Sequence, residues 1–496
     1  MNDRIIFHPI LFSFLPILFL FQYNIHEVPI TDIILPLSLS VIPVSVIWIS
    51  LKFLTNFKKS SLITSTLIIL YIVYSNLHNI LTTHENSFLQ IFGKNSILGV
   101  IFLIIGIIVI VLILKRKSIK NVNNPLNIMS ITIVGFLLVS ISGYYITNPV
   151  DYSISDYSQL EIPIFETETK PDVYMLLLDE FAGKNTLRID FDYNLQPFED
   201  RLTERGFVTP VQSFSNYPNT ELAVPSFMNM VYLDFLKDEL GIDSNDFRLP
   251  NEMRQYNTVM KIFKANDYNI TTFYGGMGLV PDVRLTDDRL CNFGTINPDL
   301  RKNFVLTYLP FSFFNEKLLE NHQYEKLECF FDTITSKNFE ETSPNFVHAH
   351  IRLPHEPFIY DEFGNKISQK NQNDKTAYLS QLKFTEKRIL ELIDTVQSRS
   401  PNSIILVMSD HGFRPEIDWQ NPKPIDHMRG FNTILSFYFP NSEVKIPSEI
   451  SSVNIFRILF NSNFNTDYEI LENRHIWYKP GKPYDFIQVS NSFKDL

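Results

Sequence analysis

Two pairs of polar residues stand directly after apolar runs that are typical of buried strands. VYMLLL leads to Asp179 and Glu180, and SIILVMS leads to Asp410 and His411. Buried strands of an α/β fold carry functional residues at their carboxyl ends. Carboxylates and an imidazole that meet there are suitable ligands for a divalent metal ion. Only the fold can bring these distant pairs together, and each pair alone is also compatible with a plain strand end or turn.

A hydroxyl for nucleophilic chemistry lies in the segment SNYPNTELAVPSFMNM, where Thr220 precedes an apolar stretch. Pro225 predicts the start of a helix, because proline fits the first helical turn. Free N–H groups at a helix start can bind phosphate or sulfate oxygens. A bound cation would lower the pKa of the threonine hydroxyl. Thr220 is therefore a nucleophile only if Asp179, Asp410 and His411 hold a metal beside it, and the spacing alone favours a turn or N-cap threonine.

Histidines follow two further strand-like runs. His355, in IRLPHEPF, could bind a substrate oxygen or protonate a leaving group, and a structural loop histidine is equally plausible. His427, in PIDHMRGFN, could be a second metal ligand or a substrate contact, although a structural role is slightly favoured. His348 and His350 alternate onto one strand face and are expected to pack or to support the ligands. Three arginines could clamp anions, although most arginines are surface residues: Arg352, Arg414 and Arg429.

The charge divides sharply along the 496 residues, which are too many for one core. Residues 1–150 hold 9 basic and 4 acidic residues, a net charge of +5, and the remainder holds 34 and 50, a net charge of −16. An acidic globular part argues against nucleic-acid binding. Cys291 and Cys329 are the two cysteines, and the sequence leaves open one disulfide or two buried thiols.

The N-terminal part contains five apolar stretches, each near the ~20 residues that a helix needs to cross a bilayer. They are expected at 5–22, 32–51, 61–81, 97–114 and 127–147. The first lacks a small-residue cleavage site, so we interpret it as a helix and not as a signal peptide.

The basic residues predict the orientation of these spans. They concentrate before span one and in the loops after spans two and four: Arg4, Lys52, Lys58, Lys59, Lys115, Arg116, Lys117 and Lys120. The other two loops carry Lys94 with three acids. The positive-inside rule then places the N-terminus in the cytoplasm and everything after about residue 150 outside.

The boundaries predicted from this pattern are a five-span domain over 1–148, a linker along the membrane surface over 149–171, and an extracytoplasmic domain over 172–496. In the last domain, five β-rich runs alternate with four helical patterns, which predicts an α/β domain with a largely parallel sheet. The strands are expected at 172–179, 268–274, 345–351, 403–409 and 432–439. The helices are expected at 194–205, 252–265, 375–398 and 452–461, with a hairpin-rich edge in the last 30 or so residues.

Taken together, four segments resemble the sulfatase-like, alkaline-phosphatase superfamily, and most closely its membrane-anchored transferase branch of lipoteichoic acid synthases and phosphoethanolamine transferases. The segments are KPDVYMLLLDE, NYPNTELAVPSFMNM, LPHEPF and VMSDHG. The resemblance covers about residues 170–440, and the five-span anchor also matches that branch.

The resemblance implies a role for each candidate. Thr220 would be the covalent nucleophile and a metal ligand, and Asp410 and His411 would bind metal with an acid of the first strand, Asp179 or Glu180. His355 would contact the transferred phosphate, and His427 the same group or a second metal. One or two divalent ions, zinc or manganese, would be bound.

The implied function is a membrane-integral transferase that moves a phospho-head-group, phosphoglycerol or phosphoethanolamine, from a membrane phospholipid to a surface glycan, polymer or lipid through a phospho-threonine. Val224-Pro225-Ser226-Phe227 departs from the C/S-x-P-x-R signature of sulfatases, and two cysteines are fewer than the lipid A transferases carry. The alternatives are a phosphodiester, phosphonate or sulfate-ester hydrolase of the same superfamily, and a non-catalytic envelope scaffold.

Overall fold

The computed structural model describes residues 5–26, 30–82, 91–116, 119, 122–149, 160–167, 170–275, 284–291, 312–336, 343–370, 374–440, 444, 446–489 and 493. The chain divides into two compact units. The first comprises Met1–Val150 with Ile296–Lys317, and the second comprises Asp151–Thr295 with Leu318–Leu496.

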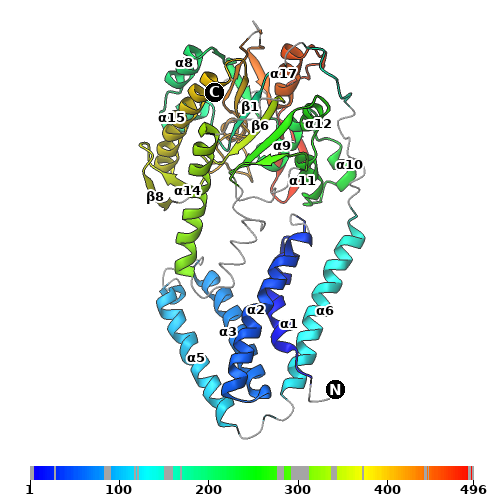
Figure 1. The fold of residues 1–496 in the computed structure, drawn as a ribbon, viewed down its shortest axis with the longest axis vertical. Helices are drawn as coiled ribbons and strands as arrows, with labels where there is room; N and C mark the ends of the chain where they lie inside the picture. Colours follow the sequence, from blue (N-terminus) through cyan, green and yellow to red (C-terminus); the bar gives the residue numbers. More distant parts are fainter. Residues whose placement is uncertain are drawn as a thin grey trace. The chain divides into compact units, whose positions relative to one another are not determined.

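The first unit is helical, as the apolar stretches predict (Figure 1). Its helices are α1 (His8–Tyr23), α2 (Ile34–Leu54), α3 (Phe57–Thr82), α5 (Asn95–Lys115) and α6 (Asn123–Thr147), with a 3-10 turn at Ile30–Ile33. In the described residues, four segments are long and apolar enough to cross a membrane: Pro36–Leu54, Phe57–His78, Ser96–Lys115 and Asn123–Thr147. The predicted first span is instead a shorter apolar helix, α1, of 16 residues. The anchor is therefore supported, and the count of five spans is not.

The short helix α1 packs inside this unit against α2, α3 and α6. Its first residue, His8, is fully buried, and its ring nitrogens lie 2.6 Å from Ser65 Oγ and 3.0 Å from Asn123 Oδ1. Asn127 Oδ1 accepts from the backbone N–H of His8. These bonds satisfy polar groups that would be costly to bury alone.

The second unit is built on a seven-stranded sheet of order β2-β10-β9-β1-β6-β4-β5. The five predicted strands are β1 (Val173–Leu178), β4 (Asn269–Tyr274), β6 (Asn345–Ile351), β9 (Ile404–Ser409) and β10 (Leu435–Tyr438), and the edges are β2 (Phe207–Val208) and β5 (Asp288–Arg289). Strands β9, β1, β6, β4 and β5 are parallel neighbours, whereas β10 is antiparallel to both β9 and β2. The predicted, mostly parallel α/β sheet is confirmed.

Each face of the sheet is covered by its own hydrophobic core, because alternate strand residues point to opposite sides. Tyr174, Leu176 and Leu178 of β1 join one core, and Val173, Met175 and Leu177 join the other. The first core holds residues of α8 (Gln196–Glu204), α14 (Ser312–Ser336) and α15 (Lys375–Arg399), and the second holds residues of α9 (Thr220–Asn229), α12 (Thr258–Ala265) and α17 (Ile455–Asn463). The two groups lie on opposite sides of β1 and β6 in Figure 1.

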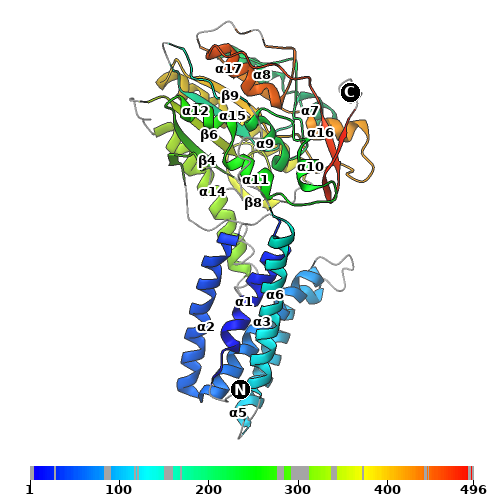
Figure 2. The ribbon, with the colours of Figure 1, turned by 90° about the vertical axis from the view of Figure 1, so that its right-hand side faces the viewer.

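The remaining helices are α7 (Lys184–Phe191), α10 (Leu236–Leu240), α11 (Arg248–Gln255), α16 (Pro424–Phe431) and a 3-10 turn at Ser452–Asn454. The remaining strands form three small sheets: β3 (Gln212–Phe214) with β11 (Glu449–Ser451), β7 (Phe358–Tyr360) with β8 (Lys366–Lys370), and β12 (Ile476–Lys479) with β13 (Lys482–Gln488). The last pair is the hairpin expected near the C-terminus, red in Figure 2.

One element differs from the expectations, and the structure adds detail on the linker and on the cysteines. The helix expected over 252–265 is two helices, α11 and α12, since Asn257 caps the second by accepting from Met260 N. Of the expected linker, residues 150–159 and 168–169 lie outside the described residues. Within its described part, Phe165 is buried against Phe464, with ring centroids 4.1 Å apart. Cys291 and Cys329 form a disulfide.

Candidate active site

The sheet brings the two acidic strand ends together, as expected. Strands β1 and β9 are adjacent and parallel, and Leu178 pairs with Ser409, so Asp179 and Asp410 follow at the same level of the same edge. Ligand atoms of Asp179, Asp410 and His411 all lie within 4.8 Å of one another, and all three residues are buried. Carboxylates of two central strands and an imidazole thus converge at the carboxyl edge.

The hydroxyl of Thr220 lies in the same cluster. Thr220 Oγ1 donates to Asp410 Oδ2 at 2.6 Å and lies 3.2 Å from His411 Nε2. The sequence expectation that helix α9 starts at Pro225 is wrong, because α9 starts at Thr220 and includes Pro225. The proline removes one N–H from the helix interior, and the helix tolerates this loss. As a result, the hydroxyl itself lies in the first turn, where free N–H groups favour anions.

The imidazole of His411 is held in one orientation. Its Nδ1 lies 2.9 Å from the carbonyl oxygen of Gly412, which can only accept. Nδ1 therefore donates this hydrogen bond, and Nε2 is directed to Thr220 and to Asp179 Oδ1, 3.9 Å away. This orientation leaves Nε2 as the nitrogen that could bind a metal.

Asp179 is a buried carboxylate whose Oδ1 accepts no hydrogen bond. Burial alone would raise its pKa, but His355, His350 and His411 hold the pKa well below its usual range. His350 Nε2, also without a hydrogen bond, lies 3.6 Å from Asp179 Oδ2. An ionised carboxylate with a free oxygen fits a metal ligand.

The neighbouring acid, Glu180, is used differently. Its Oε1 accepts from the backbone N–H of Arg414 at 2.9 Å, and its Oε2 lies 3.7 Å from His355 Nε2. Its own N–H donates to Asp410 Oδ1 at 3.2 Å. Between the two acids that the sequence leaves open, the geometry favours Asp179 as the metal ligand and Glu180 as the residue that holds Arg414 and His355.

The other expected site residues are divided. His355 is buried beside Glu180, and its Nδ1 lies 2.7 Å from the carbonyl oxygen of Glu356. Among the described residues, the structure does not bring His427 into the Asp179–Asp410–His411 cluster. Its ring packs against Trp477 at 4.9 Å, and burial lowers its pKa. Arg429 pairs with Asp190, so it is not a free anion clamp.

Two groups that the sequence patterns do not single out support or line the site. Tyr378 is fully buried, and its hydroxyl donates to the carbonyl oxygen of Glu180 at 2.8 Å and accepts from Ala182 N at 3.1 Å. Glu221 follows the nucleophile candidate, and although burial opposes ionisation, Arg414 and Arg254 lower its pKa. Only the fold reveals Tyr378, whereas the position of Glu221 next to Thr220 was a signal that could have been used.

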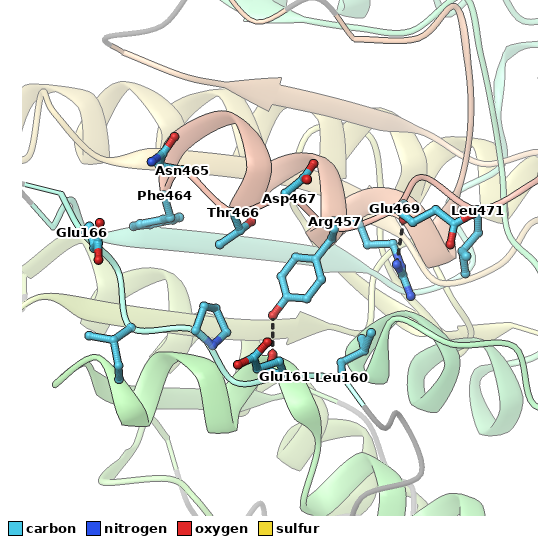
Figure 3. Close-up of a pocket in the computed structure, with 13 residues that line it drawn as sticks. Leu160, Glu161, Glu166, Arg457, Phe464, Asn465, Thr466, Asp467, Glu469 and Leu471 are labelled. Carbon is cyan, nitrogen blue, oxygen red and sulfur yellow. Dashed lines mark hydrogen bonds between the residues drawn. The ribbon is translucent and has the colours of Figure 1, made fainter.

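A separate cavity of about 630 Å³ lies between residues 160–166 and 457–471 (Figure 3). Arg457 lines it and donates to Met230 O at 2.7 and 3.1 Å, so it caps the end of α9 opposite Thr220. None of the candidate catalytic residues lines this cavity.

Comparisons with known proteins identify the family. The Sulfatase family matches residues 171–455, more than half of the chain, and the chain belongs to this family. This confirms the sulfatase-like superfamily and the class of enzyme, a sulfatase-like hydrolase or transferase. No curated protein matches the chain.

Several solved structures are similar to it. The C-terminal periplasmic domain of EcEptC from Escherichia coli is 12% identical, with 66% of this chain and 96% of that chain covered and a TM-score of 0.43. The corresponding domain of the phosphoethanolamine transferase EptC from Campylobacter jejuni is 14% identical, with 64% and 94% covered and a TM-score of 0.36. The lipoteichoic acid synthase LtaP from Listeria monocytogenes is 14% identical, with 62% and 76% covered and a TM-score of 0.34.

Proposed function

We propose that the protein is a membrane-anchored, metal-dependent transferase that moves a phospho-head-group, phosphoglycerol or phosphoethanolamine, from a membrane phospholipid to a surface glycan, polymer or lipid. The observation that carries this proposal is the position of the Thr220 hydroxyl, 2.6 Å from Asp410 and 3.2 Å from His411. Membership of the Sulfatase family supports it.

The residues fit a divalent cation. Asp179 Oδ1 is buried without a hydrogen bond, and His411 presents a lone pair toward the same point. Asp179, Asp410, His411 and Thr220 would hold zinc or manganese, since both accept carboxylate and imidazole ligands. When bound, the cation would lower the pKa of the Thr220 hydroxyl and offset the charge on the phosphate oxygens.

The side chains then have distinct roles in two displacement steps. In the first, Thr220 Oγ1 gives its proton to water and bonds to phosphorus while the bond from phosphorus to the diacylglycerol oxygen breaks. His355 would give a proton to the departing oxygen, and the first-turn N–H groups of α9 would stabilise the phosphate oxygens. In the second, an acceptor hydroxyl gives its proton to His355 and bonds to phosphorus while the bond from phosphorus to Thr220 breaks, and Thr220 regains a proton from water. Two successive transfers predict ping-pong kinetics.

The proposed location is the outer face of the membrane. The four apolar helices would keep the site near lipid head groups, which raises their effective concentration. The Lys/Arg distribution predicts that the catalytic unit faces outward. A Cys291–Cys329 disulfide supports this orientation, because disulfides persist in oxidising compartments.

Release of diacylglycerol from vesicles of phosphatidylglycerol or phosphatidylethanolamine tests the proposal. A transferase should release diacylglycerol faster when a glycan acceptor is added and should label the acceptor. A phosphodiester, phosphonate or sulfate-ester hydrolase, which the family also suggests, would release product at the same rate with water alone. No release from either lipid, with metal supplied, would contradict the proposal.

A further inference from the structure

Tyr274, the last residue of β4, lies near two cationic side chains, and a third acts on it electrostatically. Arg254 Nη2 donates to the Tyr274 hydroxyl at 3.4 Å, and Lys326 Nζ lies 5.9 Å from the centre of its ring. Burial raises the pKa of Tyr274, and Arg254 and Arg352 oppose that rise. We refer to Arg254, Lys326 and Arg352 as the Tyr274 cluster.

Arg254 is buried, and no carboxylate among the described residues lies within ion-pair distance of it. It is 8% exposed, and its hydrogen bonds are two contacts of 3.4 Å to neutral oxygens, of Asn251 and Tyr274. Arg248, on the same helix and 7% exposed, is instead bonded to the carboxylate of Asp246 at 2.9 and 3.0 Å. A buried guanidinium without a partner is strongly unfavourable, so its unused N–H groups call for an anion.

The other two members of the cluster likewise have no carboxylate partner among the residues that the structure describes. Burial lowers the pKa of Lys326 to about 8, as expected of an ammonium group that loses water without gaining a carboxylate. Arg352 Nε donates to the Glu356 carbonyl oxygen at 2.8 Å and also lies 3.3 Å from His355 Nδ1. In the part of the chain that the structure describes, none of the three lies within ion-pair distance of a carboxylate.

The Tyr274 cluster adjoins the proposed catalytic site. The Tyr274 ring lies 5.2 Å from that of His350, whose Nε2 is 3.6 Å from Asp179. Helix α11, which carries Arg254, packs on the nucleophile helix α9, and Arg254 acts electrostatically on Glu221. The nearby negative groups are thus Asp179 and Glu221, and neither is bonded to the cluster.

Beside the cluster, His348 is 8% exposed and both of its ring nitrogens lack a hydrogen bond. On the same strand, His350 is 3% exposed and its Nε2 is unpartnered. Buried polar atoms without partners are rare in folded proteins, so these rings mark a place where a polar group is missing.

We propose that the Tyr274 cluster is a second anion subsite, which binds a negatively charged oxygen group of the substrate other than the phosphate that Thr220 attacks. Three cations within one small region would bind a phosphate or a carboxylate, and the planar guanidinium groups suit bidentate contacts. This inference rests on the proposed function and narrows it: the donor head group or the acceptor carries an additional phosphate or carboxylate.

Arg254→Gln in the full-length protein tests the subsite with paired substrates. The donors are vesicles of phosphatidylglycerol or phosphatidylglycerol phosphate, and the acceptors are glucosyl- or glucuronosyl-diacylglycerol. For the member with the extra charge, we expect kcat/KM to fall by about 10–100-fold, as for a lost hydrogen bond to a charged group, with little change for its partner. If the preference for the charged member is lost within the donor pair, the subsite binds the head group. If it is lost within the acceptor pair, the subsite binds the acceptor. Arg205→Gln, which breaks an exposed pair with Asp394, should change neither ratio.

Equal loss on both members of a pair would overturn the inference, because Arg254 would then serve the transferred phosphate or the fold. The inference would also be overturned if Arg254→Gln left the ratio of kcat/KM between the charged and the uncharged member unchanged in both substrate pairs. Arg254→Lys should restore part of the preference, and Lys326→Gln offers a second variant if Arg254→Gln does not fold. Binding of the same lipids to the Thr220→Ala protein measures the preference for the extra charge without turnover. Failure of the subsite proposal can therefore be distinguished from failure of the transferase proposal.

Discussion

The Thr220 hydroxyl donates to Asp410 Oδ2 at 2.6 Å across 190 positions of sequence. One residue opens helix α9, and the other follows strand β9. Asp410 also accepts from the N–H groups of Glu180 and His411 through Oδ1, so its carboxylate is fixed before it meets the hydroxyl. Two N–H groups fix Oδ1 of Asp410, and its Oδ2 accepts from the Thr220 hydroxyl. A carboxylate held in this way is suited to position a nucleophile.

Asp410→Asn should abolish turnover with little change in shape. The amide keeps an oxygen for Glu180 N and His411 N but replaces the Oδ2 acceptor of Thr220 with a donor. We expect activity to fall by about 10³-fold or more, as for members of a catalytic set, together with a loss of bound metal. Kinetics and metal analysis of the purified protein check this. Asp418→Asn, at an exposed position, is the control, and full activity of Asp410→Asn would refute the assignment.

Tyr378→Phe should disturb the site indirectly, through the backbone that follows strand β1. It removes the hydroxyl between Glu180 O and Ala182 N, leaving both buried groups short of a partner. We expect a loss of about 1–3 kcal/mol in stability and a fall in kcat of about tenfold with KM little changed, because Tyr378 positions the loop and does not touch substrate. Melting curves and the kcat-to-KM split check this. Tyr438→Phe, whose hydroxyl contact is 3.5 Å and exposed, should have little effect.

Gly412→Ala should misplace His411. A Cβ at this position would lie 2.1 Å from the carbonyl oxygen of Arg429 and 2.8 Å from that of Asn432, and backbone atoms cannot move aside cheaply. We expect a loss of about 1–3 kcal/mol or more, with loss of metal. Gly143→Ala, with no atom within 4 Å of the added carbon, is the comparison. Retained metal content in Gly412→Ala would contradict the role given to this close contact.

Glu386 should make stability depend on pH. Burial raises its pKa to about 7, although Tyr193 and Arg201 oppose the rise. Because the folded pKa exceeds the unfolded one of 4.5, the folded state binds more protons in between, and stability falls as pH rises from about 4.5 to 7, by about 3 kcal/mol at most.

Glu386→Gln removes the free-energy cost of ionising a buried carboxyl group. The variant should therefore be more stable than the wild type above pH 7 and similar to it near pH 4.5. Melting temperatures across pH 4.5–8 check this, with Glu391→Gln on the same helix as control. The same pH slope in wild type and Glu386→Gln would show that another group is responsible.

The sequence predicts the sheet and the two acidic strand ends well, because both depend on short-range signals. Unbroken apolar runs mark central parallel strands, and polar residues after them mark the carboxyl edge. Asp179, Asp410 and His411 are found in this way without coordinates. Their approach to Thr220 follows from sheet order, which is a tertiary property.

The remaining differences arise where tertiary contacts override local signals. Pro225 lies inside α9, although proline usually marks a helix start, since the helix keeps its other contacts. His8 helps to bury α1 within its unit through contacts with Ser65 and Asn123, which are 57 and 115 positions away in the sequence. That no described carboxylate reaches Arg254 is likewise not visible in the sequence, because it depends on how distant segments pack around the guanidinium.

The most direct test of the central claim is mass spectrometry of the protein after incubation with metal and phospholipid vesicles. We predict a phospho-head-group adduct on the peptide that contains Thr220, with the mass of phosphoglycerol or phosphoethanolamine identifying the donor, and no adduct in Thr220→Ala. A Thr220→Ala protein that turns over lipid as fast as the wild type, or an adduct on a different residue, would contradict the account.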